Sequence, residues 1–290
     1  MTTGVTVLVF GVVTAAVVSM VSAFSAKHVD PVDTEPEKRR LVRFVANRPR
    51  LAHFVRERLS RATAGGLMLT VGFVSVLGLS VFVGLLFDMV DANFGFARFD
   101  ESVARWGAAN AGGALHETHL LFTRLGGSLV VTIVSIVVGI WGWWRYKNPH
   151  VAWFMVSVTV GQALINSGLK WIVARDRPDL AQLAPWSGSS FPSGHAAAAA
   201  ATYAAAALVL TLRSSRAKRA LAAGLATFIA LGVAATRALL GVHWLTDVLA
   251  GTGVGFAWFI VCAVAFGSRI MRFGEPKDEV PAPGPIEERR

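Results

Sequence analysis

Long apolar runs limit what this chain can fold into. Several reach about 18 residues or more, the length that crosses a bilayer as a helix, and 54% of the 290 residues are hydrophobic. We therefore predict an all-α, polytopic transmembrane helix bundle in the cell membrane. The expected spans lie at about 4 to 24, 67 to 90, 128 to 144, 151 to 173, 194 to 212, 220 to 240 and 246 to 267.

The first apolar run, 4 to 24, allows two interpretations. The sequence Ser-Ala-Phe-Ser-Ala at 22 to 26 resembles a signal-peptide cleavage site. No Lys or Arg precedes the run, however, whereas a signal peptide begins with a basic segment. We favour a retained helix with its N-terminus outside.

Residues 25 to 66 are polar and basic and contain two small apolar sets at helical spacing. The sets are Leu41, Phe44 and Val45, and Leu51, Phe54 and Val55. Two short amphipathic helices on a membrane surface would explain this pattern, and so would a solvated basic linker. We accordingly divide the chain into an N-terminal span and linker (1–66), a transmembrane core (67–267) and a disordered, Pro-containing tail (268–290).

The basic residues are distributed asymmetrically. Threading seven spans with 25 to 66 inside leaves 21 of the 28 Lys and Arg residues on the inner side. This positive-inside bias orients the chain and explains its charge without a nucleic-acid partner. It also places three polar clusters, at 170–178, 190–195 and 236–247, together on the outer side.

Other features point to packing. The lone cysteine, Cys262, lies in an apolar run, so we expect a packing residue. Gly251 and Gly255 fit a small-xxx-small pattern of close helix contact.

Residues 91 to 126 are too polar to cross the bilayer, and we predict short interfacial helices there. His116 and His119 are three residues apart, a spacing that could bind a metal, but no carboxylate or cysteine pattern accompanies them, so we expect a surface pair. We assign no cofactor to the chain.

The first cluster contains Lys170, Arg175, Arg177 and Pro178. If a helix continued through it, Lys170 and Arg177 would share a face and Arg175 would lie on another, with Pro178 ending the helix. Cations at the end of a span also commonly reach for lipid head groups. Taken alone, this cluster does not decide between the two.

The second cluster predicts an anion site at a helix start. Ser190 suits a cap and Pro192 a first turn, so the N–H groups of Ser193, Gly194 and His195 would point outward. Such a terminus binds phosphate, and Gly194 permits close approach. An isolated His195 would more often be structural.

The third cluster places His243 and Asp247 four residues apart, on one helical face. The carboxylate would orient the imidazole as a nucleophile. Gly241 would turn the chain and bring Arg237 to the same ligand. A surface ion pair is the simpler alternative for one pair, but ionisable groups in membrane segments are costly and usually functional, and here three clusters share one side.

These residues closely resemble the signature of the type 2 phosphatidic acid phosphatase superfamily, K-x6-R-P, P-S-G-H and S-R-x5-H-x3-D. The matching residues are Lys170, Arg177-Pro178, Pro192-Ser193-Gly194-His195, Arg237, His243 and Asp247. Thr236 replaces the usual serine and keeps its hydroxyl. The resemblance covers about residues 150 to 265.

The resemblance implies six core helices, here preceded by an extra N-terminal span, and a metal-independent phosphatase. His243 would form a phosphohistidine, Asp247 would orient it, and His195 would protonate the leaving oxygen and then activate water. The phosphoryl oxygens would be held by Lys170, Arg177, Ser193, Gly194 and Arg237.

The motifs do not identify the substrate. We expect a lipid phosphomonoester or diphosphate at the outer leaflet, either a glycerolipid of the phosphatidic acid type or a polyprenyl diphosphate. A small-molecule phosphatase like glucose-6-phosphatase shares the signature, as do vanadate haloperoxidases, which are soluble relatives. A non-catalytic phosphate-lipid transporter or scaffold belongs to a different class. The sequence leaves the oligomeric state open.

Overall fold

The computed structural model describes residues 61–110, 113–180 and 183–270. Within these ranges every regular element is helical, which confirms the all-α, multi-span prediction. The elements are α4 (Arg61–Asp91), η1 (Gly95–Phe99), α5 (Asp100–Asn110), α6 (Gly113–Thr123), η2 (Arg124–Gly126), α7 (Ser128–Tyr146), α8 (His150–Val173), α9 (Gly194–Leu210), α10 (Arg216–Leu239) and α11 (Leu245–Ile270).

Four described helices are long and apolar enough to cross a membrane: α7, α8, α10 and α11 as far as Gly267. Residues 76–91 of α4 meet the same criterion only together with residues 95–110, and the two segments are bent by 56°. Helix α9 has 17 residues, two fewer than predicted. At about 1.5 Å per residue it falls short of a 30 Å hydrocarbon core.

The other helices end within a few residues of the predicted bounds. The largest difference is α4, which begins at Arg61 rather than 67, because apolar length predicts the membrane-crossing part of a helix and not its polar ends. The predicted span at 4 to 24, the two amphipathic helices before residue 56 and the tail after 270 lie outside the described residues.

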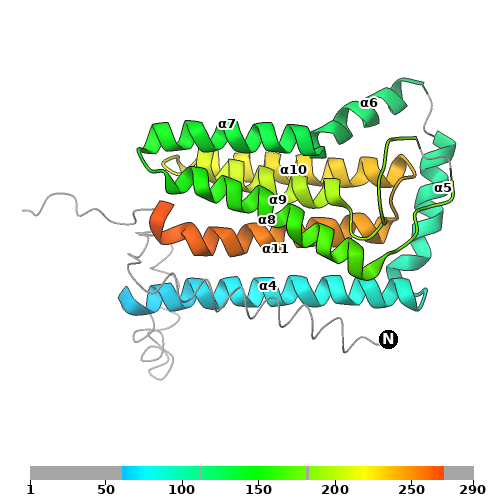
Figure 1. Ribbon diagram of the computed structural model, residues 1–290, viewed down its shortest axis with the longest axis horizontal. Coiled ribbons are helices and arrows are strands. Elements are labelled where there is room, and N and C mark those ends of the chain that lie inside the picture. Colours follow the sequence, from blue (N-terminus) through cyan, green and yellow to red (C-terminus); the bar gives the residue numbers. More distant parts are fainter. Residues whose placement is uncertain (1–60, 111–112, 181–182, 271–290) are drawn as a thin grey trace, which may run out of the picture.

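The long helices run side by side, and α5 lies across one end of them (Figure 1). Helix α9 is central and packs against α7, α8, α10 and α11. Its alanines from Ala196 to Ala201 are all buried. Helix α4 lies on the outer side of α11.

Two glycines of α11 allow the close contact with α9. A Cβ on Gly251 would lie 2.4 Å from the Ser193 carbonyl oxygen, and one on Gly255 would lie 2.3 Å from that of Ala197. Only residues without a side chain permit such an approach. The predicted role of Gly251 and Gly255 in helix packing is confirmed, and the contact fixes the start of α9 against α11.

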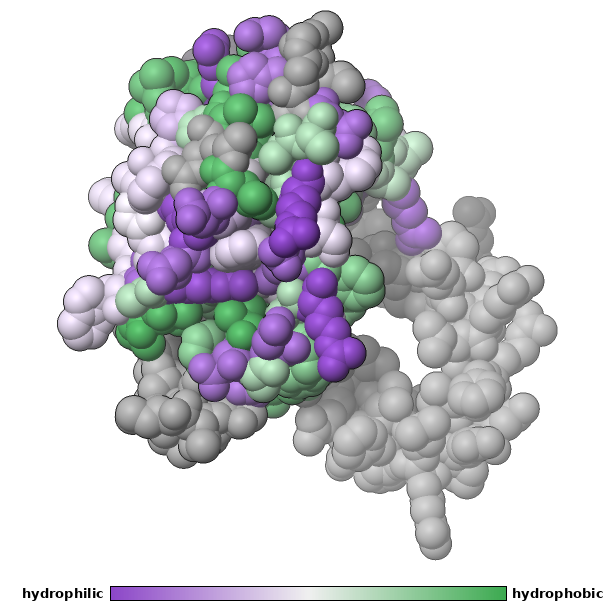
Figure 2. All heavy atoms as spheres, turned by 90° about the vertical axis from the view of Figure 1, so that its right-hand side faces the viewer, coloured by the Kyte–Doolittle hydropathy of each residue, from purple (hydrophilic) through white to green (hydrophobic). Residues whose placement is uncertain are grey.

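The short helices predicted for residues 91 to 126 are present as η1, α5, α6 and η2. They gather at the same end of the bundle as the loops that carry the three polar clusters (Figure 1). Viewed onto this end, hydrophilic side chains gather near the middle of the face, with hydrophobic ones above and below (Figure 2).

Candidate active site

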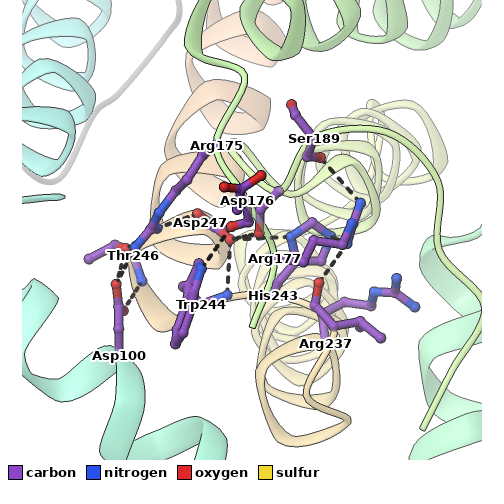
Figure 3. A network of polar contacts seen from close by, with 12 residues as sticks. Asp100, Arg175, Asp176, Arg177, Ser189, Arg237, His243, Trp244, Thr246 and Asp247 are labelled. Carbon is purple, nitrogen blue, oxygen red and sulfur yellow. Dashed lines mark hydrogen bonds and ion pairs between the residues drawn. The ribbon is translucent and has the colours of Figure 1, made fainter. Parts of the chain in front are cut away.

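All three polar clusters meet at one end of the bundle. Lys170 lies in the last turn of α8, His195 in the first turn of α9, and Arg237 in the last turn of α10. Arg177 lies in the connection between α8 and α9, His243 in the turn before α11, and Asp247 in the first turn of α11. The α8–α9 and α10–α11 connections thus contribute to one site (Figure 3).

Helix α8 ends before Arg177, so the helical face proposed for Lys170 and Arg177 does not exist. Ala174 adopts a left-handed conformation with φ 47° and donates its N–H to the Lys170 carbonyl at 3.0 Å. The chain from Ala174 to Pro178 belongs to no helix. Lys170 and Arg177 nevertheless reach the same region, because the Lys170 ammonium and an Arg177 Nη both donate to the Ser189 carbonyl.

Arg177 is clamped by backbone carbonyls. Its guanidinium donates to the carbonyls of Ser187 at 2.9 Å, Gly188 at 3.0 Å and Val242 at 2.5 Å. Its planar group also lies 4.9 Å from the Trp186 ring centroid, within the range of a cation–π contact. The guanidinium therefore has a fixed position next to His243.

The start of α9 differs from the prediction. The helix begins at Gly194 with Ser193 at the N-cap, so Pro192 precedes the helix and Ser190 does not cap it. The Ser190 hydroxyl instead donates to Asp247. The Ser193 N–H is not free, since it donates to the Asp247 carbonyl at 3.0 Å.

The remaining groups at this terminus can still receive an anion. Gly194 and His195 are the first helical residues, and their N–H groups have no acceptor within the helix. Ser193 Oγ is buried and has no hydrogen-bond partner among the described residues. Lys170, Arg177 and Arg237 lie close enough to His195 for their charges to act on it, so this terminus is near the cationic side chains.

His243 and Asp247 do not share a helical face, because His243 precedes α11. Their contact arises from the turn: His243 Nδ1 lies 3.4 Å from Asp247 Oδ2, an ion-pair distance longer than a normal hydrogen bond. On the other side of the ring, Nε2 lies 3.3 Å from Arg177 Nη1. The imidazole thus has one nitrogen toward a carboxylate and the other toward a cation.

Burial controls the protonation of His243, which is only 2% exposed. It lowers the pKa of His243 from 6.5 to about 4, although the neighbouring Asp247 raises it. Above about pH 4 the ring is therefore neutral, and a neutral imidazole has a free electron pair for attack.

Asp247 closes the start of α11. Its Oδ2 accepts the Trp244 N–H at 2.9 Å, so a carboxylate at the third helical position reaches back to the residue before the helix, as in a capping box. Asp247 is fully buried. Its position is therefore determined by the helix start as well as by His243.

Arg237 comes from the end of α10, as the turn at Gly241 was expected to allow. Gly241 has φ 68°, a left-handed conformation that glycine adopts without a steric cost. Arg237 is buried, donates to the Pro185 carbonyl at 3.3 Å, and leaves its Nε without a partner among the described residues. The Thr236 hydroxyl donates to the Val233 carbonyl within the helix.

The sequence did not predict several residues of the polar network. Arg175 was assigned to another face, yet it donates to Asp247, and Asp100 and Thr246 join it (Figure 3). For Arg175, the only indication in the sequence was its position in the first cluster, two residues before Arg177. Asp100 carried no such signal, because it lies 75 residues from its partner.

Within the described ranges, no three His, Cys, Asp or Glu side chains form a group that could hold a metal ion. What the site offers is three cations, of which Arg237 is buried, together with a helix start and two histidines. Such a set can bind a phosphoryl group and transfer it to nitrogen.

Comparisons with known proteins point the same way. The model of the PAP2 superfamily matches residues 150–271. Phosphatidylglycerophosphatase B of Bacillus subtilis is 34% identical over 161 residues, which cover 55% of this chain and 78% of that protein. A lipid A 1-phosphatase of Rhizobium etli is 31% identical over 176 residues, which cover 53% of this chain and 72% of the relative.

A solved structure shares the fold. The crystal structure of a transmembrane PAP2-type phosphatidylglycerolphosphate phosphatase from Bacillus subtilis superposes with a TM-score of 0.63 at 28% identity. The match covers 69% of this chain and 99% of that one.

Proposed function

Because the chain belongs to the PAP2 superfamily of membrane lipid phosphatases, we propose that it hydrolyses a lipid phosphomonoester or diphosphate through a phosphohistidine at His243. The observation that carries this proposal is the placement of the His243 ring between Asp247 and Arg177. Its Nε2 faces the cations that would bind the phosphoryl group.

In the first step, His243 Nε2 attacks phosphorus, an N–P bond forms, and the bond to the leaving oxygen breaks. His195 gives its proton to that oxygen. In the second step a water molecule attacks phosphorus, His195 takes the water proton, and the N–P bond breaks. Asp247 stabilises the positive charge that His243 carries between the two steps.

The phosphoryl oxygens carry the charge that grows in the transition state. We assign them to Lys170, Arg177, Arg237, the Ser193 hydroxyl and the Gly194 N–H. The unpartnered Ser193 Oγ and Arg237 Nε support this assignment, since a buried polar atom without a partner is costly unless a ligand satisfies it.

A lipid substrate fits the surroundings of the site. Trp171, the neighbour of Lys170 at the end of α8, is 85% exposed, and Ile172 is 60% exposed. An apolar surface next to a phosphate site suits a substrate whose chains stay in the bilayer. The relatives named for phosphatidylglycerophosphate and lipid A favour a glycerolipid or a lipid A-type phosphate over a polyprenyl diphosphate.

The topology is part of the same proposal. Helices α4 and α7 to α11 would form the six core helices, residues 4 to 24 would add a seventh span, and the positive-inside bias would place the site on the extracytoplasmic side. A cysteine introduced at Ser187, an exposed residue in the loop of the site, should then react with a membrane-impermeant thiol reagent on intact cells, and one at Ser214 should not.

A panel of lipid phosphates tests the activity. Purified full-length protein would be offered phosphatidylglycerophosphate, phosphatidic acid, a lipid A 1-phosphate and a polyprenyl diphosphate, and phosphate release would be measured. We expect release from at least one, with a loss of about 10³-fold or more in His243→Ala. The control is His150→Ala, an exposed histidine that contacts Asn148.

The intermediate has its own test. With a radiolabelled phosphoryl group, an alkaline quench during turnover should trap a label on the wild-type protein that is stable to alkali and lost in acid, and His243→Ala should carry no such label. No phosphate release from any lipid, or release unchanged in His243→Ala, would reject the function.

A further inference from the structure

A buried ion pair lies directly behind the catalytic carboxylate. Arg175 Nη2 lies 2.9 Å from Asp100 Oδ2, and Arg175 Nη1 lies 2.6 Å from Asp247 Oδ1. The side chain of Arg175 is 16% exposed and that of Asp100 is 5% exposed. One guanidinium is therefore shared between two carboxylates that come from distant parts of the chain (Figure 3).

Asp100 also closes the start of α11. Its Oδ1 accepts the Thr246 N–H at 2.9 Å, and its Oδ2 accepts the Thr246 hydroxyl at 2.7 Å. A helix start needs such an acceptor, and the residue before α11 is Trp244, whose side chain has no oxygen. The first residue of α5 therefore caps the helix that carries Asp247.

The two contacts together determine how Asp247 lies. Arg175 occupies Oδ1, while Oδ2 receives the Ser190 hydroxyl and the Trp244 N–H and faces His243. If Arg175 were absent, Oδ1 would have no cationic partner in this arrangement. If Asp100 were absent, Arg175 would be paired with Asp247 alone.

We propose that Asp100 and Arg175 are positioning residues that orient Asp247 toward His243 and balance its charge. The proposal rests on the proposed function of His243. It extends the catalytic machinery to the segment formed by α4, η1 and α5, which we call the N-terminal arm (61–110). Asp100 lies in this arm, where η1 meets α5, and therefore outside the region that matches the PAP2 model, 150–271. The arm would therefore act on the nucleophile through two buried contacts.

The charges give this role a signature that simple packing lacks. The groups facing His243 are Asp247, Arg177, Arg237 and His195. Arg175→Gln removes a positive charge behind Asp247, so the His243 imidazolium becomes easier to form. Asp100→Asn removes a negative charge and has the opposite effect. The two variants should shift the titration of His243 in opposite directions.

Two readouts on the full-length enzyme test the proposal. We expect kcat to fall by between about tenfold and 10²-fold in both variants, with KM nearly unchanged, because the phosphate-binding side chains are intact. The acid limb of kcat/KM should move by about one pH unit, upward in Arg175→Gln and downward in Asp100→Asn. Arg175→Lys keeps the positive charge, so its acid limb of kcat/KM should lie at the wild-type pH.

The same shifts should appear without substrate, in the NMR titration of the His243 ring signal, assigned by its loss in His243→Ala. This readout separates the proposal from the function: a wild type that hydrolyses no lipid ends the function, whereas the titration still tests the positioning. The double variant Asp100→Asn/Arg175→Gln should titrate near the wild type, because the charges cancel.

The matched control lies one residue away. Glu101 and Arg105 form an ion pair on the same helix as Asp100, with their charged atoms 2.5 Å apart. Both side chains are exposed, at 65% for Glu101 and 67% for Arg105. Glu101→Gln and Arg105→Gln should leave kcat, KM and the titration unchanged. The proposal is overturned if Arg175→Gln and Asp100→Asn leave the His243 titration in place, or move it in the same direction, whatever they do to thermal stability.

Discussion

Arg177 Nη1 lies 3.3 Å from His243 Nε2, on the side of the ring opposite Asp247. A cation directly beside a nucleophilic nitrogen would hold the phosphoryl group for attack, because the guanidinium would bind phosphate oxygens and so keep the phosphorus next to that nitrogen. The carbonyls of Ser187, Gly188 and Val242 keep the guanidinium there.

Replacing Arg177 should therefore damage the chemistry more than binding. We expect Arg177→Lys to lower kcat by about 10²- to 10³-fold, since Lys keeps a charge but cannot reproduce the planar fork. Steady-state kinetics on the best lipid of the panel measures this. Arg105→Lys, at an exposed position, is the control, and an Arg177→Lys enzyme with normal kcat would mean that the guanidinium only shapes the loop.

The pH dependence should reflect the burial of His243. Burial lowers the pKa of His243 to about 4, and the ring must be neutral to attack. Activity limited by His243 should thus persist below pH 6.5 and be lost as the pH falls toward about 4. The measurement is kcat/KM against pH, with the ionisation of the lipid phosphate followed separately by phosphorus NMR. If the acid limb of kcat/KM, corrected for the ionisation of the lipid, fell at the ordinary histidine pKa of about 6.5, His243 would be more hydrated than the structure indicates.

The sequence predicted the positions of the membrane-spanning helices well, but not the detailed geometry of the candidate active site. Long apolar runs predicted where helices α7 to α11 lie, because bilayer crossing demands length and apolarity regardless of tertiary contacts. The motif spacings predicted which polar residues meet. The way they meet was not predictable: Ala174 ends α8 in a left-handed conformation that favours glycine rather than alanine, and no local pattern indicates it.

Asp100 and Ser190 illustrate the same limit. Ser190 looked like a cap because serine often precedes a helix. Helix α9 begins four residues later, at Gly194, and the Ser190 hydroxyl donates to the buried Asp247 instead. Asp100 contacts residues 146 positions away. Contacts of this range depend on how α5 crosses the end of the bundle, which a single sequence does not encode as a period or motif.

Ser190→Ala tests the hydroxyl bond to Asp247. A hydrogen bond to a charged group contributes about 1.5–3 kcal/mol, and losing it leaves one donor fewer on Asp247 Oδ2, which also receives the Trp244 N–H. We expect a fall in kcat of roughly tenfold or more, with KM little affected. Ser102→Ala removes an exposed hydroxyl that donates to the Phe99 carbonyl, just before α5, and should be neutral. Equal effects of the two substitutions would contradict the role given to Ser190.

The contact between α9 and α11 can be tested through its glycines. A Cβ at Gly251 would lie 2.4 Å from the Ser193 carbonyl oxygen, so Gly251→Ala must push the start of α9 away from α11. Overpacking of this kind costs about 1–3 kcal/mol, and it displaces Ser193, Gly194 and His195 together. We expect a lower thermal midpoint and a loss of activity that exceeds the loss of folded protein.

Gly253 provides the matched comparison two residues along the same helix. A Cβ there would meet only side-chain atoms of Val83 and Phe82, at 3.5 Å or more, an ordinary van der Waals contact. Gly253→Ala should therefore keep both stability and activity, since it leaves the α9 terminus in place. If Gly253→Ala and Gly251→Ala lowered activity alike, the loss would come from α11 as a whole, and the anion-binding start of α9 would not depend on the close approach at Gly251.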